Sequence, residues 1–491
     1  MYDMTKYLRL VDEVIEKGPY KDNWASLSQI KVPSWFPKAK LGIFIHWGLY
    51  SIPQNSNEWY SRNMYIKGMP AYEHHIKTYG KQKDFGYKDF IPMFTAEKFD
   101  PKEWADLIEE SGAKYVFPVA EHHEGFQMYK SEISHWNAYE MGPKRDILGE
   151  LKNEFESRGL IFCTSSHRAE HWFFMGHGKE FDSDVKEPLI RGDFYWPSMP
   201  EPENMDLFSE PYPTEEYLQD WLIRTCEIID QYQPKALYFD WWIQHEAFKP
   251  YLKKLAAYYY NRGVEWGKEV IICYKYDAMA YGCGLVEVER GKFADVKPFY
   301  WQTDTSVANN SWCYTLQNDY KTARQVIYEF IDIVSKNGNM LLNIGPKGDG
   351  SIPEQDASIL KGLGAWLKVN GEAFYDSRVW KRPGEGPTET KEGHFTDMGK
   401  LEYTSQDMRF TVREDYLYTT VFVYPKDGNV TITSLKRLKD PNQAVFHGIV
   451  KNVEILGFEE TPTWEHTEEG LTVHTSHVAS ELPVVIKIQF A

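Results

Sequence analysis

The stretch "ALYFDWW" (residues 236–242) is a short, almost continuously apolar run that leads into one carboxylate, Asp240, and two tryptophans. An apolar run without strict alternation is typical of a parallel strand that is covered by helices on both faces. A carboxylate in such surroundings is costly unless it has a partner or a purpose. From this stretch alone Asp240 could be a buried structural charge, a helix cap or a catalytic group.

Seven more runs of the same kind lie in the first 350 residues, separated by helical patterns. They are "LGIFIH" (41–46), "YVFPVA" (115–120), "LIFCTSS" (160–166), "VIICYKY" (270–276), "LVEVE" (285–289), "FYWQTD" (299–304) and "NMLLNIGP" (339–346). Eight strands with helical crossovers predict an α/β fold of the (β/α)8 TIM-like barrel type. The gaps between the fifth, sixth and seventh strands are too short for full helices, so a doubly wound open sheet remains an alternative.

The sequence changes character after residue 378. A Pro/Gly-rich connector, "KRPGEGPTETKEG" (381–393), leads into short runs with turn residues between them, which are typical of antiparallel strands. We therefore predict a catalytic barrel domain over residues 1–380 and a C-terminal β-sandwich over residues 381–491. The second domain shows no cluster of reactive residues, so we expect it to pack against the barrel.

Composition excludes several classes of partner. The formal net charge of −17 over 491 residues argues against nucleic acid and anionic membranes, which would be repelled. No run of eighteen apolar residues is present, so no membrane span is predicted. The N-terminal segment shows no apolar signal-peptide core, so a cytoplasmic location is expected, or a periplasmic or secreted one if a leader was removed. The five cysteines include no CxxC pair, which indicates neither a disulfide framework nor a cysteine metal site. The sequence leaves open whether the protein forms a homo-oligomer.

Polar and aromatic side chains collect where the predicted strands end, and in a barrel the catalytic groups project from those carboxyl ends. They are His46, His122, His123, His167, Asp240, Glu287, Glu289, Trp301 and Asp304. Singly, each has an ordinary explanation: His46 would be a hydrogen-bonded core histidine, and Glu287 and Glu289, which share a strand face, would be surface charges. Together they predict a polar pocket with aromatic walls.

Two chemistries fit such a pocket. One is glycoside hydrolysis by a pair of carboxyl groups. The other is metal-assisted hydrolysis, with His46, His122, His123 and Asp240 as ligands. Adjacent histidines on a strand should point to opposite faces, and no HExxH motif is present, so we favour hydrolysis with neither a metal nor another cofactor. A catalytically inactive carbohydrate-binding protein on the same barrel is a further alternative.

Several segments, in this order, resemble family 29 glycoside hydrolases, the α-L-fucosidases. They include "KLGIFIHWGLYSIP", "NEWYSRNMY", "AKYVFPVAEHHEGFQMY", "YQPKALYFDWW" and "IVSKNGNMLLNIGPKGDGSIP", and the resemblance extends from about residue 40 to residue 378. It implies a retaining exo-α-L-fucosidase that acts through a covalent fucosyl-aspartate. The implied substrate is a fucosylated oligosaccharide or glycoconjugate.

The resemblance also implies roles for individual residues. Asp240 matches the nucleophile at the end of "PKALYFD". The positions that match fucose contacts are His46, Glu58, Trp59, His122 and His123. The acid/base position varies in the family, and we predict Glu289, with Glu287 in reserve, because "VEVERGK" lies about fifty residues after the nucleophile.

This chain departs from the family at two places. Where many members have glycine after the nucleophile it has Trp241 and Trp242, and "CTSSHRAEHW" replaces a tyrosine-containing motif. We therefore expect His167 to be a substitute sugar contact. Trp242 or Trp301 is expected to contact the methyl group of fucose.

Overall fold

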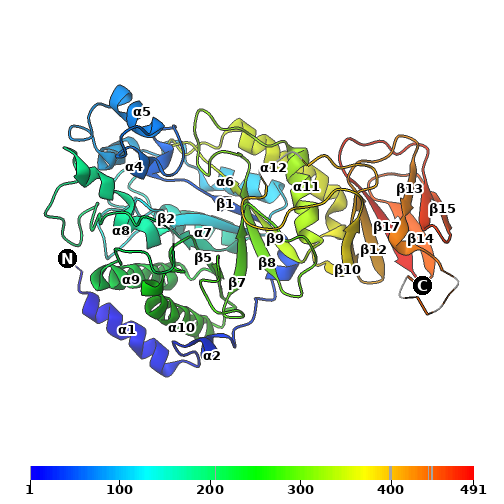
Figure 1. Ribbon diagram of the computed structural model, residues 1–491, viewed down its shortest axis with the longest axis horizontal. Helices are drawn as coiled ribbons and strands as arrows, with labels where there is room; N and C mark the ends of the chain where they lie inside the picture. The colour runs from blue at the N-terminus through cyan, green and yellow to red at the C-terminus, as the bar shows by residue number, and fades with distance from the viewer. Residues whose placement is uncertain (1, 205, 398–400, 439, 441, 444–445) are drawn as a thin grey trace.

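The computed structural model describes residues 2–204, 206–397, 401–438, 440, 442–443 and 446–491. A barrel with its helices forms the N-terminal part, and antiparallel sheets lie beside it at the C-terminus (Figure 1).

All eight predicted strands form and pair in parallel. They are β1 (Leu41–Ile45), β2 (Tyr115–Glu121), β3 (Ile161–Phe162) with β4 (Thr164–Ser166), β5 (Ala236–Phe239), β6 (Ile271–Tyr274), β7 (Leu285–Glu289), β8 (Trp301–Ser306) and β9 (Gly338–Ile344). The segments β3 and β4 occupy one position beside β2. Because β1 pairs with both β2 and β9, the sheet closes on itself. The barrel prediction is confirmed, and the open-sheet alternative is wrong.

Helices cover the outside of the barrel. The α-helices are α1 (Met4–Lys17), α2 (Trp24–Leu27), α3 (Phe36–Ala39), α4 (Tyr60–Asn63), α5 (Pro70–Thr78), α6 (Pro101–Glu110), α7 (Ile147–Ser157), α8 (His171–Phe174), α9 (Glu215–Tyr232), α10 (Lys249–Trp266), α11 (Ala323–Val334) and α12 (Glu354–Asn370). Helix α1 lies along α9 and α10 on the outer surface (Figure 1). Asp100, Thr214 and Thr322 cap α6, α9 and α11 with their side chains, which fixes where these crossovers begin.

Two crossovers of the barrel are short. Residues 275–284 and 290–300, all of them described, contain no helix. The mouth of the barrel beside β6 and β7 is therefore bordered by loops, as the short gaps in the sequence indicated.

A cluster of buried side chains fills the barrel interior below the strand ends. Phe44, Phe117, Tyr238, Leu285 and Leu341 point inward and pack together. Such layers make a barrel a packed core and not a pore. The cluster therefore forms a floor beneath the carboxyl ends of the strands.

The C-terminal part consists of two sheets around a separate core. Its strands are β10 (Arg378–Glu385), β11 (Met408–Arg413), β12 (Tyr416–Val421), β13 (Asn429–Ile432), β14 (Val450–Ile455), β15 (Thr463–His466), β16 (Leu471–His474) and β17 (Val484–Phe490). The sheets have the orders β10-β11-β12-β17-β14 and β13-β16-β15, and their pairings are antiparallel, as predicted.

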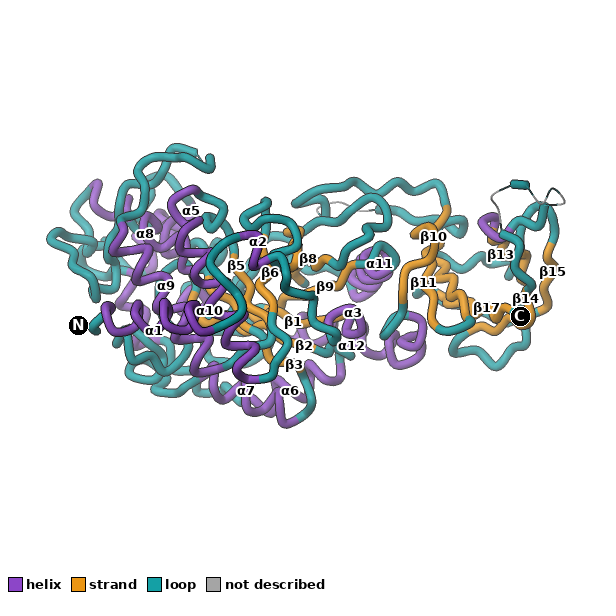
Figure 2. Tube along the Cα trace, turned by 90° about the horizontal axis from the view of Figure 1, so that it is seen from below, coloured by secondary structure: helices purple, strands orange, loops and turns teal. Residues whose placement is uncertain are grey.

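The segment 381–393 is not only a connector. Its first residues belong to β10, and the loop after β10 returns toward the barrel (Figure 2). There Gly393 forms a bridge with Lys292. A buried ion pair also joins the two parts, because Arg409 of β11 donates to Asp332 of α11 over 2.7 Å. The barrel and the sheets are thus joined by paired polar groups.

All five cysteines are buried and free, as their spacing indicated. Among the described residues no helix combines the length and the apolar character that a membrane crossing requires.

Candidate active site

A pocket of about 270 Å³ opens at the carboxyl ends of the barrel strands. It is lined by His46, Asn57, Glu58, Trp59, His122, His123, His167, Tyr238, Asp240, Trp241, Lys275, Glu289, Asp304, Trp312 and Phe395. Nine of the residues predicted from the sequence are in this group: His46, Glu58, Trp59, His122, His123, His167, Asp240, Glu289 and Asp304. The pocket therefore lies at the strand ends, as predicted.

Two predicted sugar contacts lie elsewhere. The side chain of Trp242 is buried and packs against Trp172 and Phe173, because the chain turns sharply after Asp240 and directs Trp241 toward the pocket instead. Trp301 is the first residue of β8, so it lies at the opposite end of the barrel, where its indole N–H donates to the carbonyl of Lys336. The expectation that either indole contacts the sugar methyl is wrong.

Glu287, the reserve acid, also lies outside the pocket. It shares the inward face of β7 with Glu289, as the two-residue spacing predicted, but it is one layer deeper. There Gln302 donates to its Oε2 over 2.8 Å. Burial raises the pKa of Glu287 well above its usual range, and repulsion by Asp304 adds to this. The geometry favours Glu289 because it alone of the two reaches the pocket.

Lys275 connects the acidic groups of the site. This buried residue follows β6, and its Nζ lies 3.1 Å from Asp240 Oδ1, 2.9 Å from Glu289 Oε2 and 3.3 Å from Asp304 Oδ2. Three carboxyl groups around one ammonium leave an excess of negative charge if all three ionise. Retention of a proton by one of them is therefore favoured.

Asp240 is the carboxyl group that remains ionised. Its side chain is 14% exposed, and burial alone would raise its pKa. The ammonium of Lys275 and a hydrogen bond from His167 outweigh burial and hold the pKa well below the usual range. Because an ionised carboxylate can only accept, the bond of 3.2 Å places a proton on His167 Nδ1.

Glu289 is in the opposite state. Burial raises its pKa to about 8, and repulsion by Asp240 and Asp304 adds to this, while Lys275 opposes it. Asp304 has a further donor, because the hydroxyl of Tyr238 lies 2.7 Å from its Oδ2. Glu289 is therefore the group best placed to carry the proton near neutral pH.

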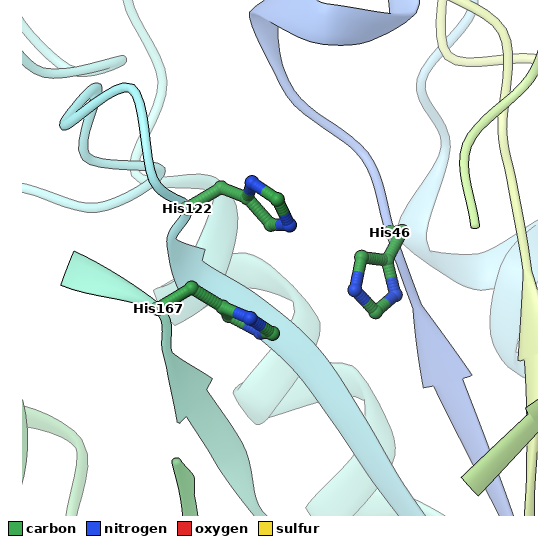
Figure 3. A group of neighbouring side chains, drawn as sticks. All are labelled: His46, His122 and His167. Atoms are coloured by element: carbon green, nitrogen blue, oxygen red, sulfur yellow. The ribbon is translucent and has the colours of Figure 1, made fainter. Parts of the chain in front are cut away.

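Four histidines line the side of the pocket that is formed by the ends of β1, β2 and β4. Figure 3 shows the rings of His46, His122 and His167 turned toward a common space from neighbouring strand ends. His46 Nδ1 lies 2.7 Å from Asn343 Oδ1, and the Nδ2 of Asn343 donates elsewhere, so the imidazole donates and its Nε2 is a free acceptor.

The directions of the His122 and His123 rings differ from what their adjacent positions in the sequence predicted. Strand β2 ends at Glu121, so the two residues lie in the following turn, and both rings face the pocket with centroids 4.3 Å apart. The expectation that they point to opposite faces is wrong. His123 Nδ1 is 2.9 Å from the carbonyl of His167 and therefore donates. Burial lowers the pKa of His123 to about 3, so the ring is neutral and its Nε2 is an acceptor.

The family model described as Alpha-L-fucosidase matches residues 8–372 of the chain. The chain belongs to the α-L-fucosidase family. It is 28% identical to plasma α-L-fucosidase of Homo sapiens over 482 residues, which cover 93% of this chain and 90% of the relative. It is 32% identical to tissue α-L-fucosidase of Macaca fascicularis over 366 residues, which cover 74% and 73% of the two chains.

Solved structures of α-L-fucosidases share the fold. The α-fucosidase of Thermotoga maritima, in complex with a mechanism-based inhibitor, superposes with a TM-score of 0.74 at 29% identity, covering 96% of this chain and 100% of that one. A second structure of the same enzyme, in complex with fucose, gives a TM-score of 0.73. The resemblance, the fold class and the assignment to the glycoside hydrolases are confirmed.

Six lining residues were given no role in the sequence analysis: Asn57, Tyr238, Trp241, Lys275, Trp312 and Phe395. Lys275 could have been found, because a lone lysine directly after the apolar run "VIICY" requires a carboxylate partner. Phe395 could not, since the turn-rich segment around it carries no pattern that places it at the barrel.

Two sets of side chains in the pocket could act as metal ligands. They are His46, His122 and His167, and His123, His167 and Asp240, with donor atoms in each set within 4.8 Å of one another. His167 is in both sets, and its two ring nitrogens already bond to Asp240 and Ser165. The donor sets are therefore a poor fit for a resident ion.

Proposed function

We propose that the protein is a retaining exo-α-L-fucosidase that removes terminal fucose from fucosylated oligosaccharides or glycoconjugates. The observation that carries the proposal is the arrangement of Asp240 and Glu289 around one ammonium group, that of Lys275. The two carboxyl groups are thereby held close together in opposite protonation states.

The separation of these two groups supports retention of configuration. One oxygen of each carboxyl lies within about 3 Å of Lys275 Nζ, so those two oxygens are at most about 6 Å apart. Carboxyl groups in retaining glycosidases are about 5–5.5 Å apart, and those in inverting ones roughly 6.5–9.5 Å, which leaves room for a water molecule. The shorter range fits this pocket.

The reaction then needs two steps. The carboxylate of Asp240 attacks the anomeric carbon while Glu289 gives its proton to the departing glycosidic oxygen, which yields a fucosyl-aspartate. Glu289, now ionised, takes a proton from water, and the water oxygen displaces Asp240. The fucose is released with its original anomeric configuration.

The neutral histidines are suited to holding the sugar. The Nε2 atoms of His46 and His123 can each accept a hydrogen bond from a hydroxyl group. Glu58 offers a carboxyl group that Trp312 N–H orients over 3.0 Å. The packed cluster beneath the pocket closes it, so a terminal sugar fits better than an internal one.

An assay with 4-nitrophenyl α-L-fucoside tests the proposal, with 4-nitrophenyl α- and β-D-galactosides as controls. We expect hydrolysis of the fucoside alone, and NMR should show the α anomer of fucose as the first product. Release of the β anomer would contradict retention. Binding of fucose without hydrolysis would instead indicate a carbohydrate-binding protein.

Chelation separates this mechanism from metal-assisted hydrolysis. After exhaustive dialysis against EDTA, followed by removal of the chelator, kcat/KM on the aryl fucoside should be unchanged, because both catalytic groups belong to the chain. A loss of activity that zinc restores would revive the metal mechanism.

The pH profile should reflect the two carboxyl groups. Activity requires Glu289 protonated, so kcat/KM should fall as the pH rises through about 8. Lys275 lowers the pKa of both Asp240 and Glu289. In the variant Lys275→Gln, both the acidic limb and the alkaline limb of the pH profile of the remaining kcat/KM should therefore lie at higher pH than in the wild type. An alkaline limb that stays in place would show that Glu289 is not the acid.

A further inference from the structure

Four aromatic side chains form a row along one side of the pocket mouth. The ring of His394 stacks on Tyr276 at 4.1 Å, Tyr276 packs on Trp241 at 4.4 Å, and Trp241 lies nearly parallel to Phe395, with an angle of 18° and centroids 6.3 Å apart. Trp241 and Phe395 line the pocket itself. We call these four residues the aromatic row.

The row is assembled from both parts of the chain. Trp241 directly follows Asp240, and Tyr276 directly follows Lys275. His394 and Phe395 come from the segment that follows β10, 105 and 106 positions after Glu289 in the chain and beyond the barrel. Each member is therefore adjacent, in sequence or in space, to a group that carries charge in the site.

The segment 393–397 is fixed to the end of β7 by hydrogen bonds to the main chain of Glu289 and Arg290. The N–H of Glu289 donates to His394 Nδ1 over 3.0 Å, and the carbonyl of Glu289 accepts from Phe395 N–H over 2.8 Å. Asp397 N–H donates to the carbonyl of Arg290, and its side chain pairs with Arg290 and Lys321. Both the main-chain N–H and the carbonyl of Glu289 thus bond to this segment, which holds Phe395 beside Glu289.

The backbone of the row is strained. Tyr276 has φ 49° and Phe395 has φ 55°, and Trp242, next to Trp241, has φ 72°. This left-handed region is unfavourable for aromatic side chains and persists only where the surrounding structure enforces it. Strain at three separate segments that meet around one opening is typical of a binding site.

Phe395 presents an exposed aromatic face at the pocket. The residue is 48% exposed and belongs to none of the three hydrophobic cores, and Trp241 is half-buried. Flat aromatic faces beside an acid that protonates a leaving group lie where that leaving group emerges. The C–H face of a pyranose ring is apolar and matches such a surface.

We propose that Trp241 and Phe395 form the subsite for the leaving-group sugar, where they stack against the apolar face of a pyranose such as galactose or N-acetylglucosamine. This rests on the proposed fucosidase activity. In this proposal the fucose is bound by the histidines of the pocket, and the second sugar is selected by the aromatic row. The segment after β10 supplies part of that row.

The test compares Phe395→Ala with the wild-type full-length protein on two kinds of substrate. α-L-Fucosyl fluoride has no leaving-group sugar, whereas disaccharides with fucose α-linked to galactose or N-acetylglucosamine have one. On the disaccharide that the wild type cleaves fastest, kcat/KM of the variant should fall roughly 10-fold, mainly through KM. On the fluoride it should change less than about 2-fold, and Phe395→Tyr should restore disaccharide cleavage because a ring is retained.

Tyr281→Ala is the matched control, because Tyr281 is an aromatic residue with 70% exposure that does not line the pocket. Its kinetics should be those of the wild type on both substrates. Equal losses of Phe395→Ala on both substrates, or no loss on either, would overturn the proposal. So would a wild type that hydrolyses the fluoride and none of the disaccharides. A wild type inactive on the fluoride would instead contradict the proposed function.

Discussion

The variant Asp240→Ala should lose activity on an aryl α-L-fucoside by several orders of magnitude while remaining folded. It removes the carboxyl group of the pocket that Lys275 and a hydrogen bond from His167 keep ionised. Without it no covalent intermediate can form, and the leaving group is displaced only by solvent. Steady-state kinetics with the purified variant, together with its circular dichroism spectrum, measure this effect.

Azide should partly restore the activity of this variant. The anomeric configuration of the fucosyl azide that forms shows whether the nucleophile or the acid was removed. The anion would occupy the space left by the carboxylate and attack directly, so the product should be β-L-fucosyl azide. With Glu289→Ala the azide would instead attack the fucosyl-aspartate and give the α azide. Undiminished activity of Asp240→Ala, or an α azide from it, would remove Asp240 as the nucleophile.

The variant Glu289→Ala should show a loss that depends on the leaving group. For a fucosyl disaccharide, whose leaving oxygen is basic, kcat/KM should fall roughly 10²- to 10⁴-fold because proton donation is lost. For 2,4-dinitrophenyl α-L-fucoside the first step needs no acid, so its rate should stay near that of the wild type. The comparison requires kinetics on both substrates with one enzyme preparation.

Glu287→Gln provides the matched control for this experiment. Glu287 lies two residues earlier on the same face of β7, and the substitution keeps its size. We expect the ratio of the kcat/KM values on the two substrates to be the same as in the wild type. A leaving-group effect larger at Glu287 than at Glu289 would move the acid to Glu287.

The sequence predicted the strands of the barrel because each is specified by a local apolar run. The missing helices after β6 and β7 and the change to antiparallel strands also follow from such runs and from the lengths between them. Closure of the sheet did not, because it depends on the pairing of β1 with both β2 and β9. The exact strand bounds were less accurate. Taking Trp301 as part of a strand end, when it begins β8, was enough to place it at the wrong end of the barrel.

The candidate site was predictable where its residues directly follow a strand. His46, His167 and Asp240 do so, and all of them line the pocket. The direction of a side chain in the turn beyond the strand was not predictable, which explains the error at Trp242. Contacts between distant segments, such as that of Phe395 with Glu289, have no local signature at all.

The loop after β7 is short, and the mouth of the barrel on that side is completed by Phe395, which comes from the segment after β10. In the proposed function the histidines after β1, β2 and β4 hold the fucose, and this segment contacts the leaving-group sugar. Changes in the segment would then alter substrate preference while the chemistry is kept. Grafting the corresponding segment of a relative onto residues 390–397 should therefore transfer substrate preference.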